Sequence, residues 1–131
     1  MNDNPYRRPA VDGHAPDRGT LFLLAGIGSA LASLYWGALT LLIFVGVAAG
    51  SVSGMQLILP IVLIGLYAVR AFQIFKGDAN AAQKVLWLHG VGGAMAVFQM
   101  LSGGPMLIVL QGIKVVLHLF GGVTAYLAQR R

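Results

Sequence analysis

The chain has 131 residues, of which 57% are hydrophobic and only 10% are charged, and its formal net charge is +5. A soluble domain of this length needs many more polar side chains to cover its surface, so this composition, with a mean hydropathy of +0.77, indicates an integral membrane protein. The basic residues fall mostly at the ends of apolar runs, which membrane topology explains better than a nucleic acid partner. The absence of cysteine excludes disulfides, thiolate metal sites and a thiol nucleophile.

Residues 1–19 are polar, contain prolines and arginines, and show no hydrophobic periodicity. We expect a disordered cytoplasmic tail, or one that lies along lipid headgroups. This segment is not a signal peptide, because the apolar run that follows is about twice as long as the hydrophobic region of a signal.

Four apolar runs follow the tail. Because a helix needs about 20 apolar residues to cross a bilayer, each run is long enough for one span. The predicted spans are residues 20–50, 55–75, 82–101 and 105–127. Their short connections favour antiparallel packing of neighbours, so residues 20–131 are predicted to form one all-α bundle of four transmembrane helices.

Basic residues mark one side of this predicted bundle. The tail, the connection at 76–81 and the C-terminus carry lysines or arginines, whereas the connections at 50–54 and 102–104 carry no charge. With four spans, the positive-inside rule places both the N- and C-termini in the cytoplasm. We therefore expect a multi-pass protein of a bacterial inner membrane.

The third and fourth predicted spans share the pattern L-H-x-x-G-G-x-x-A. Its histidines and glycines are His89, Gly92 and Gly93 in the third span and His118, Gly121 and Gly122 in the fourth. In a helix, residues three and four positions apart lie on one face, so each histidine has glycines on its own face. At 1.5 Å per residue, counted in opposite directions, the two histidines lie at about the same depth.

Two level imidazoles beside glycines could ligate a b-type haem from opposite sides, with the glycines making room for the macrocycle. Glycines at this spacing also favour close helix packing, in which the histidines would form hydrogen bonds across the interface. A different polar site is the third possibility. Ordinary packing is the favoured interpretation, and absorbance after reconstitution with haem would test the haem alternative.

Gln111, Lys114 and His118 are spaced so that they share one helix face. Lys114 lies near the centre of the fourth span, where a charged lysine costs about 2.5–3.5 kcal/mol on insertion scales. None of the acidic residues of the chain is expected near the bilayer centre: Asp3, Asp12, Asp17 and Asp78. No ion pair within the chain is therefore expected.

Four compensations for Lys114 remain open. Its amine could be neutral, could donate to Gln99, Gln111 or backbone carbonyls, could face water, or could have a counter-ion from a partner subunit or an anionic ligand. Gln99, Gln111, Lys114, His118 and His89 are predicted to line one seam between the third and fourth helices.

Tyr35 and Trp36 fall in the middle of the first span. Aromatic residues of membrane helices commonly lie at the bilayer interface, which is where Trp87 is expected. Tyr35 and Trp36 are therefore expected in the core or against a ligand.

The chain contains no catalytic or nucleotide-binding motif and no carboxylate inside a span. We therefore expect a non-catalytic accessory or interaction subunit of a membrane complex, with a protein partner or a second copy, and without a metal or cofactor. One alternative is an electron-transfer protein that binds haem b through His89 and His118. The other is a small channel or transporter for an anionic or neutral solute, with Lys114 in the pathway.

Overall fold

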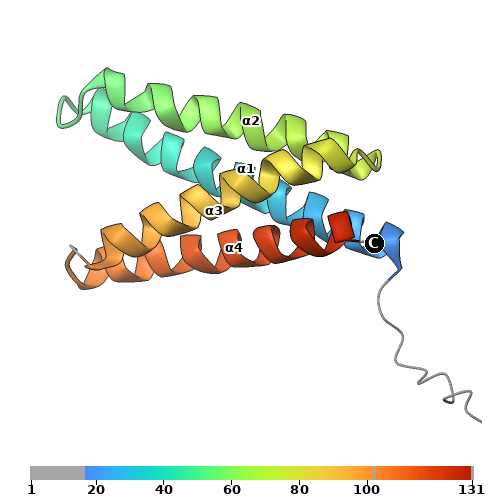
Figure 1. Ribbon diagram of the computed structural model, residues 1–131. Coiled ribbons are helices and arrows are strands. Elements are labelled where there is room, and N and C mark those ends of the chain that lie inside the picture. The colour runs from blue at the N-terminus through green and yellow to red at the C-terminus, as the bar shows by residue number, and fades with distance from the viewer. Residues whose placement is uncertain (1–16, 102, 131) are drawn as a thin grey trace, which may run out of the picture.

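The computed structural model describes residues 17–101 and 103–130, and this part of the chain is helical apart from short connections. The elements are α1 (Arg18–Ala48), the short 3-10 helix η1 (Gly54–Leu57), α2 (Ile58–Phe75), α3 (Ala79–Leu101) and α4 (Pro105–Arg130) (Figure 1). The prediction of an all-helical chain is confirmed, and the helix ends differ from the predicted spans by three residues or fewer. The predicted disordered tail lies, as far as residue 16, outside the described residues.

Two aspartates explain why α1 and α3 begin before the apolar runs do. The carboxylate of Asp17 accepts a hydrogen bond of 2.6 Å from the backbone N–H of Thr20, and this bond holds the pKa of the Asp17 carboxyl below its usual value. Oδ1 of Asp78 accepts hydrogen bonds from the N–H groups of Asn80 at 2.9 Å and Ala81 at 3.2 Å. Both carboxylates thus satisfy N–H groups that the first helical turn leaves without a partner.

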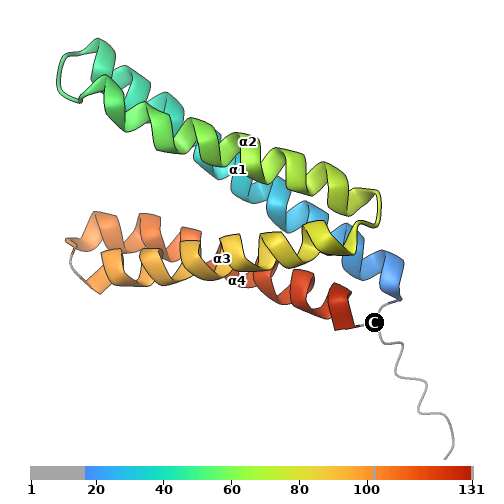
Figure 2. The same cartoon turned by 45° about the horizontal axis from the view of Figure 1, so that its top comes forward.

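The four helices form two hairpins, α1–α2 and α3–α4, that cross one another (Figure 1). α1 packs along α2 and against α4, and α3 packs along α4, whereas α2 and α3 meet over a short stretch. The hairpins lie close together at the end that carries the α2–α3 connection and the C-terminus, which we call the joined end (Figure 2). They separate toward the α1–α2 and α3–α4 connections, which we call the divergent end.

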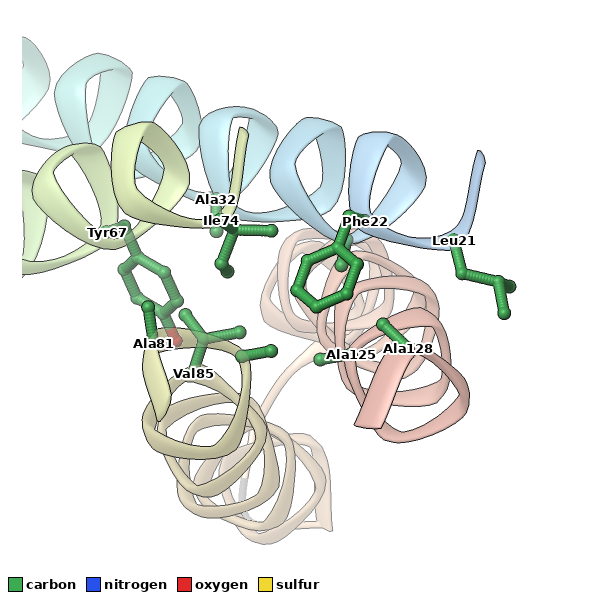
Figure 3. Packing of buried hydrophobic residues seen from close by; sticks show 11 residues of the cluster. Leu21, Phe22, Ala32, Tyr67, Ile74, Ala81, Val85, Ala125 and Ala128 are labelled. Atoms are coloured by element: carbon green, nitrogen blue, oxygen red, sulfur yellow. The ribbon is translucent and has the colours of Figure 1, made fainter. Parts of the chain in front are cut away.

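A core of mostly small side chains holds the joined end together (Figure 3). Its members come from all four helices: Leu21, Phe22, Ala25, Ala32, Tyr67, Ile74, Ala81, Ala82, Val85, Ala125 and Ala128. Small residues let helices approach closely, and α1 meets α4 where a Cβ added to Gly28 would lie 2.7 Å from Cα of Gly121. Large apolar side chains such as Leu41 and Leu101 point outward and are exposed.

Three helical segments of the described chain are long and apolar enough to cross a membrane: Arg18–Ala48, Gly54–Phe75 and Ile108–Arg130. α3 has 23 residues but is not among them. The span predicted at residues 82–101 therefore stays a prediction, although the residues themselves form a helix.

Candidate functional site

His89 on α3 and His118 on α4 face one another across the α3–α4 hairpin. Both side chains are buried, with 1% and 4% of their surface exposed, and their Nδ1 atoms lie 2.9 Å apart. A neutral imidazole has one N–H donor and one bare nitrogen acceptor, so this contact is a hydrogen bond in which one ring donates and the other accepts. The antiparallel helices thus bring into contact the two histidines of the repeated pattern.

Each imidazole lies in the glycine notch of the opposite helix. A Cβ added to Gly92 would lie 2.6 Å from Nε2 of His118, and a Cβ added to Gly121 would overlap Nε2 of His89. The second glycine of each pair would make an ordinary contact of 3.4 Å with the Cβ of the same histidine: Gly93 with His118, and Gly122 with His89. Each glycine pair therefore makes room for the histidine ring of the other helix. The repeated sequence pattern had associated each pair with the histidine of its own helix.

This arrangement of the rings does not fit a haem between His89 and His118. A haem iron bound by imidazole nitrogens from opposite sides would hold the two nitrogens about 4 Å apart, because each bond from a metal to a histidine nitrogen is about 2 Å long. The two Nδ1 atoms are closer than that, and the two Nε2 atoms face glycine backbone. A bis-histidine haem would require both rings to leave their notches.

Tyr67 of α2 completes a buried cluster of three rings. Its hydroxyl lies 3.5 Å from Nδ1 of His118, and its ring centroid lies 5.1 Å from that of His89 and 6.1 Å from that of His118. If the hydroxyl donates to Nδ1 of His118, that nitrogen carries no proton, so His89 donates to it through its own Nδ1–H. Among the described residues, neither Nε2 atom has a hydrogen-bond partner.

Adding a methyl group at Gly121 is expected to destabilise the α3–α4 hairpin. The new Cβ would overlap the enclosed ring of His89, so Gly121→Ala should lower the free energy of unfolding by about 1–3 kcal/mol, the usual cost of overpacking. Gly112→Ala on the same helix would meet nothing within 4 Å and should be neutral or stabilising by up to about 1 kcal/mol. Thermal unfolding in detergent measures both, and equal melting temperatures would show that the notch can accept a methyl group.

Lys114 of α4 lies against α1. Its side chain is 6% exposed, and its Nζ lies 4.5 Å from the centroid of the Trp36 ring. An ammonium this close to the face of an indole is attracted by the negative electrostatic potential of the ring. Within the described ranges no carboxylate pairs with Lys114, because Asp17 and Asp78 lie at the starts of helices. Trp36, which the sequence placed in the core or against a ligand, thus supplies a partner that was not anticipated for the lysine.

A cavity of about 250 Å³ lies between the two hairpins, and Lys114 forms part of its wall. Side chains with polar atoms that share this wall are Trp36, Tyr67, Gln99 and His118. The rest of the wall is apolar apart from backbone: Leu59, Leu63, Leu88, Val91, Gly92 and Met95. We call this space the hairpin cavity.

The residues predicted to form one seam divide into two groups. Gln99 and His118 line the hairpin cavity with Lys114, whereas His89 and Gln111 do not. Oε1 of Gln111 is buried and has no hydrogen-bond partner among the described residues. His118 connects the cavity wall with His89, because the two histidines form a hydrogen bond. Sequence reasoning missed Tyr67, whose one available signal was a tyrosine well inside an apolar run.

Comparison of the chain with protein-family models, with curated proteins and with solved structures found no match.

Proposed function

We propose that this chain is a multi-pass membrane protein that binds a small organic anion in the hairpin cavity and does not itself catalyse a reaction. The observation that carries this proposal is the buried ammonium of Lys114 in the cavity wall, with an indole ring beside it instead of a carboxylate. Most of the remaining wall is apolar, which suits a ligand with an apolar body and one anionic group, such as a small carboxylate.

The energy balance of Lys114 supports an anionic ligand. A charged lysine near the centre of a span costs about 2.5–3.5 kcal/mol, and a desolvated cation–π contact with Trp36 offsets about 2 kcal/mol of this. About 1 kcal/mol remains uncompensated. An anion beside Nζ would provide this compensation, because Coulomb attraction is strong where water is excluded.

We place α3 in the membrane together with the three more apolar helices. It packs along α4, and its exposed side chains beyond the first turns are large and apolar: Trp87, Val91, Met95, Val97, Phe98 and Leu101. Basic residues lie at the joined end of the bundle: Arg18, Arg70, Lys76, Lys84 and Arg130. The positive-inside rule then places the joined end, with both termini, in the cytoplasm, in the manner of a bacterial inner-membrane protein.

Single cysteines test this topology, because the chain has no native cysteine. A membrane-impermeant maleimide should react in intact cells with Ser51→Cys and Gly104→Cys at the divergent end. Asn80→Cys and Arg130→Cys at the joined end should react only after lysis. If α3 lay on the membrane surface, the thiols at positions 80 and 104 would react from the same side.

Benzoate is a suitable probe for the hairpin cavity, because it combines one carboxylate with an apolar ring. In a Trp87→Phe background, the fluorescence of Trp36 reports on the cavity alone, and benzoate should change it in a saturable manner. Benzyl alcohol has a similar size without the charge and should bind at least about tenfold more weakly, which corresponds to about 1.4 kcal/mol. Equal binding of the two compounds, or no saturable signal, would contradict the proposal.

An accessory subunit is the second candidate. In that case a carboxylate of a partner would lie beside Lys114, and the separation of the hairpins at the divergent end favours entry of a partner helix there (Figure 2). Native purification with mass spectrometry distinguishes the two. A stable complex that does not bind benzoate supports the subunit, whereas a monodisperse protein that binds benzoate supports the ligand site.

A further inference from the structure

A second groove, of about 420 Å³, lies between α2 and α3 near the joined end. We call it the lipid groove, and its wall is formed by Leu66, Arg70, Lys84, Trp87, Leu88 and Val91. Arg70 precedes Gly77 of the α2–α3 turn by seven residues, and Lys84 follows it by seven. Antiparallel helices therefore place the two cationic side chains opposite one another across the groove.

Neither cation of the lipid groove is neutralised within the described part of the chain. The guanidinium of Arg70 donates a hydrogen bond of 2.6 Å to Oε1 of Gln73, which orients it and leaves other N–H donors, since a guanidinium has five. Lys84 is exposed. Two cations without a carboxylate between them favour an anion at this position.

The position of these cations along the helices matches the headgroup region of the proposed membrane. Arg70 lies five residues before the end of α2, and Lys84 lies five residues after the start of α3, which is about 7–8 Å of helix in each case. Their long side chains can reach the headgroups from this depth. Trp87 is 71% exposed, and indole rings favour the same region.

The apolar part of the wall distinguishes a phospholipid from a free phosphate. The groove has an apolar surface farther from the joined end than its two cations, formed by Leu66, Leu88 and Val91. This surface therefore lies on the side of the cations that faces the membrane interior. A free phosphate gains nothing from contact with that apolar surface, whereas an acyl chain would bury it and remove it from water.

We propose that the lipid groove binds an anionic phospholipid, with its phosphate between Arg70 and Lys84 and one acyl chain along Leu66, Leu88 and Val91. The proposal rests on the membrane placement of α2 and α3 given above, and it is independent of the anion at Lys114. Basic pockets between transmembrane helices on the cytoplasmic side are suited to anionic lipid headgroups.

Quenching of Trp87 by brominated lipid tests this site. The Trp36→Phe variant, in which Trp87 is the one remaining tryptophan, is reconstituted into phosphatidylcholine vesicles that contain a small fraction of brominated lipid. Brominated phosphatidylglycerol should associate with Trp87 more strongly than brominated phosphatidylcholine does. Each basic residue contributes about fivefold to such a preference, so Arg70→Gln/Lys84→Gln should reduce the preference by about 25-fold or abolish it.

The matched control is Lys76→Gln/Arg130→Gln, which removes the same charge from the same end of the bundle but outside the lipid groove. This variant should retain most of the preference, and an equal loss would show diffuse attraction and overturn the site. Competition by glycerol phosphate at equal potency would also overturn it, in favour of a free phosphate site. Equal quenching by both lipids would overturn the lipid groove alone, whereas no quenching by either would contradict the membrane placement.

Discussion

Lys114→Met is expected to weaken benzoate binding by at least about 30-fold, which is about 2 kcal/mol or more. The substitution removes the lysine cation from the wall of the hairpin cavity while it keeps an unbranched side chain of similar length. A carboxylate that enters the cavity would then lose its hydration without gaining a charged donor. Titration with Trp36 fluorescence in the Trp87→Phe background measures the affinity.

Two controls separate this effect from unfolding and from general loss of charge. Lys114→Met removes a buried charge that is only partly compensated, so its melting temperature should equal or exceed that of the unsubstituted chain. Lys76→Met makes the same chemical change at the exposed start of the α2–α3 connection, where Nζ lies 4.2 Å from the Phe72 ring centroid, and it should leave benzoate affinity unchanged. Benzoate binding that survives in Lys114→Met would rule out the proposed role of the lysine.

His89→Ala is expected to lower the free energy of unfolding by about 2–4 kcal/mol, the largest stability effect that the structure predicts. The substitution empties the notch at Gly121 and leaves Nδ1 of His118 without its 2.9 Å partner. Unfolding by a denaturing detergent, followed by circular dichroism, measures the change. Leu119→Ala on the outward face of α4 is the control and should cost much less, because this side chain is 61% exposed.

A double-mutant cycle with His118→Ala tests whether the two histidines act as one unit. Because the rings share a hydrogen bond, the double variant should lose less stability than the sum of the single variants, by about 1 kcal/mol. If the two losses were strictly additive, the two histidines would not interact energetically, and the proposed hydrogen bond between them would be contradicted.

A visible spectrum of the same preparations tests haem, since a Soret band that disappears in His89→Ala would support the cytochrome alternative.

The histidine pair shows how far sequence reasoning extends toward a site. Counting residues from the centres of two antiparallel helices placed His89 and His118 at one depth, and the structure brings their Nδ1 atoms together. The same count says nothing about the rotation of each helix about its axis. The position of each ring in the partner's glycine notch therefore could not be read from the repeated pattern.

The surroundings of Lys114 show where such reasoning ends. The sequence predicts side-chain partners for Lys114 on the third and fourth helices, whereas the contact observed is with Trp36 of α1. Trp36 and Lys114 are 78 positions apart in the sequence, and two other helices lie between them. The crossing of the hairpins decides which residues meet. Tyr67 was missed for the same reason, because α2 reaches His118 through that crossing.

The sequence by itself determined the all-helical chain, the helix bounds to within a few residues and, among the residues that the structure describes, the absence of an acid near Lys114. These properties are local, since they follow from the hydropathy of a run, from the residues that begin a helix and from which residues exist at all. Only the tertiary structure decided that α1 packs against α4, that the hairpins separate at one end and that a cavity forms around Lys114. Those features depend on close approach at small residues such as Gly28 and Gly121, which fixes how helices far apart in the chain cross.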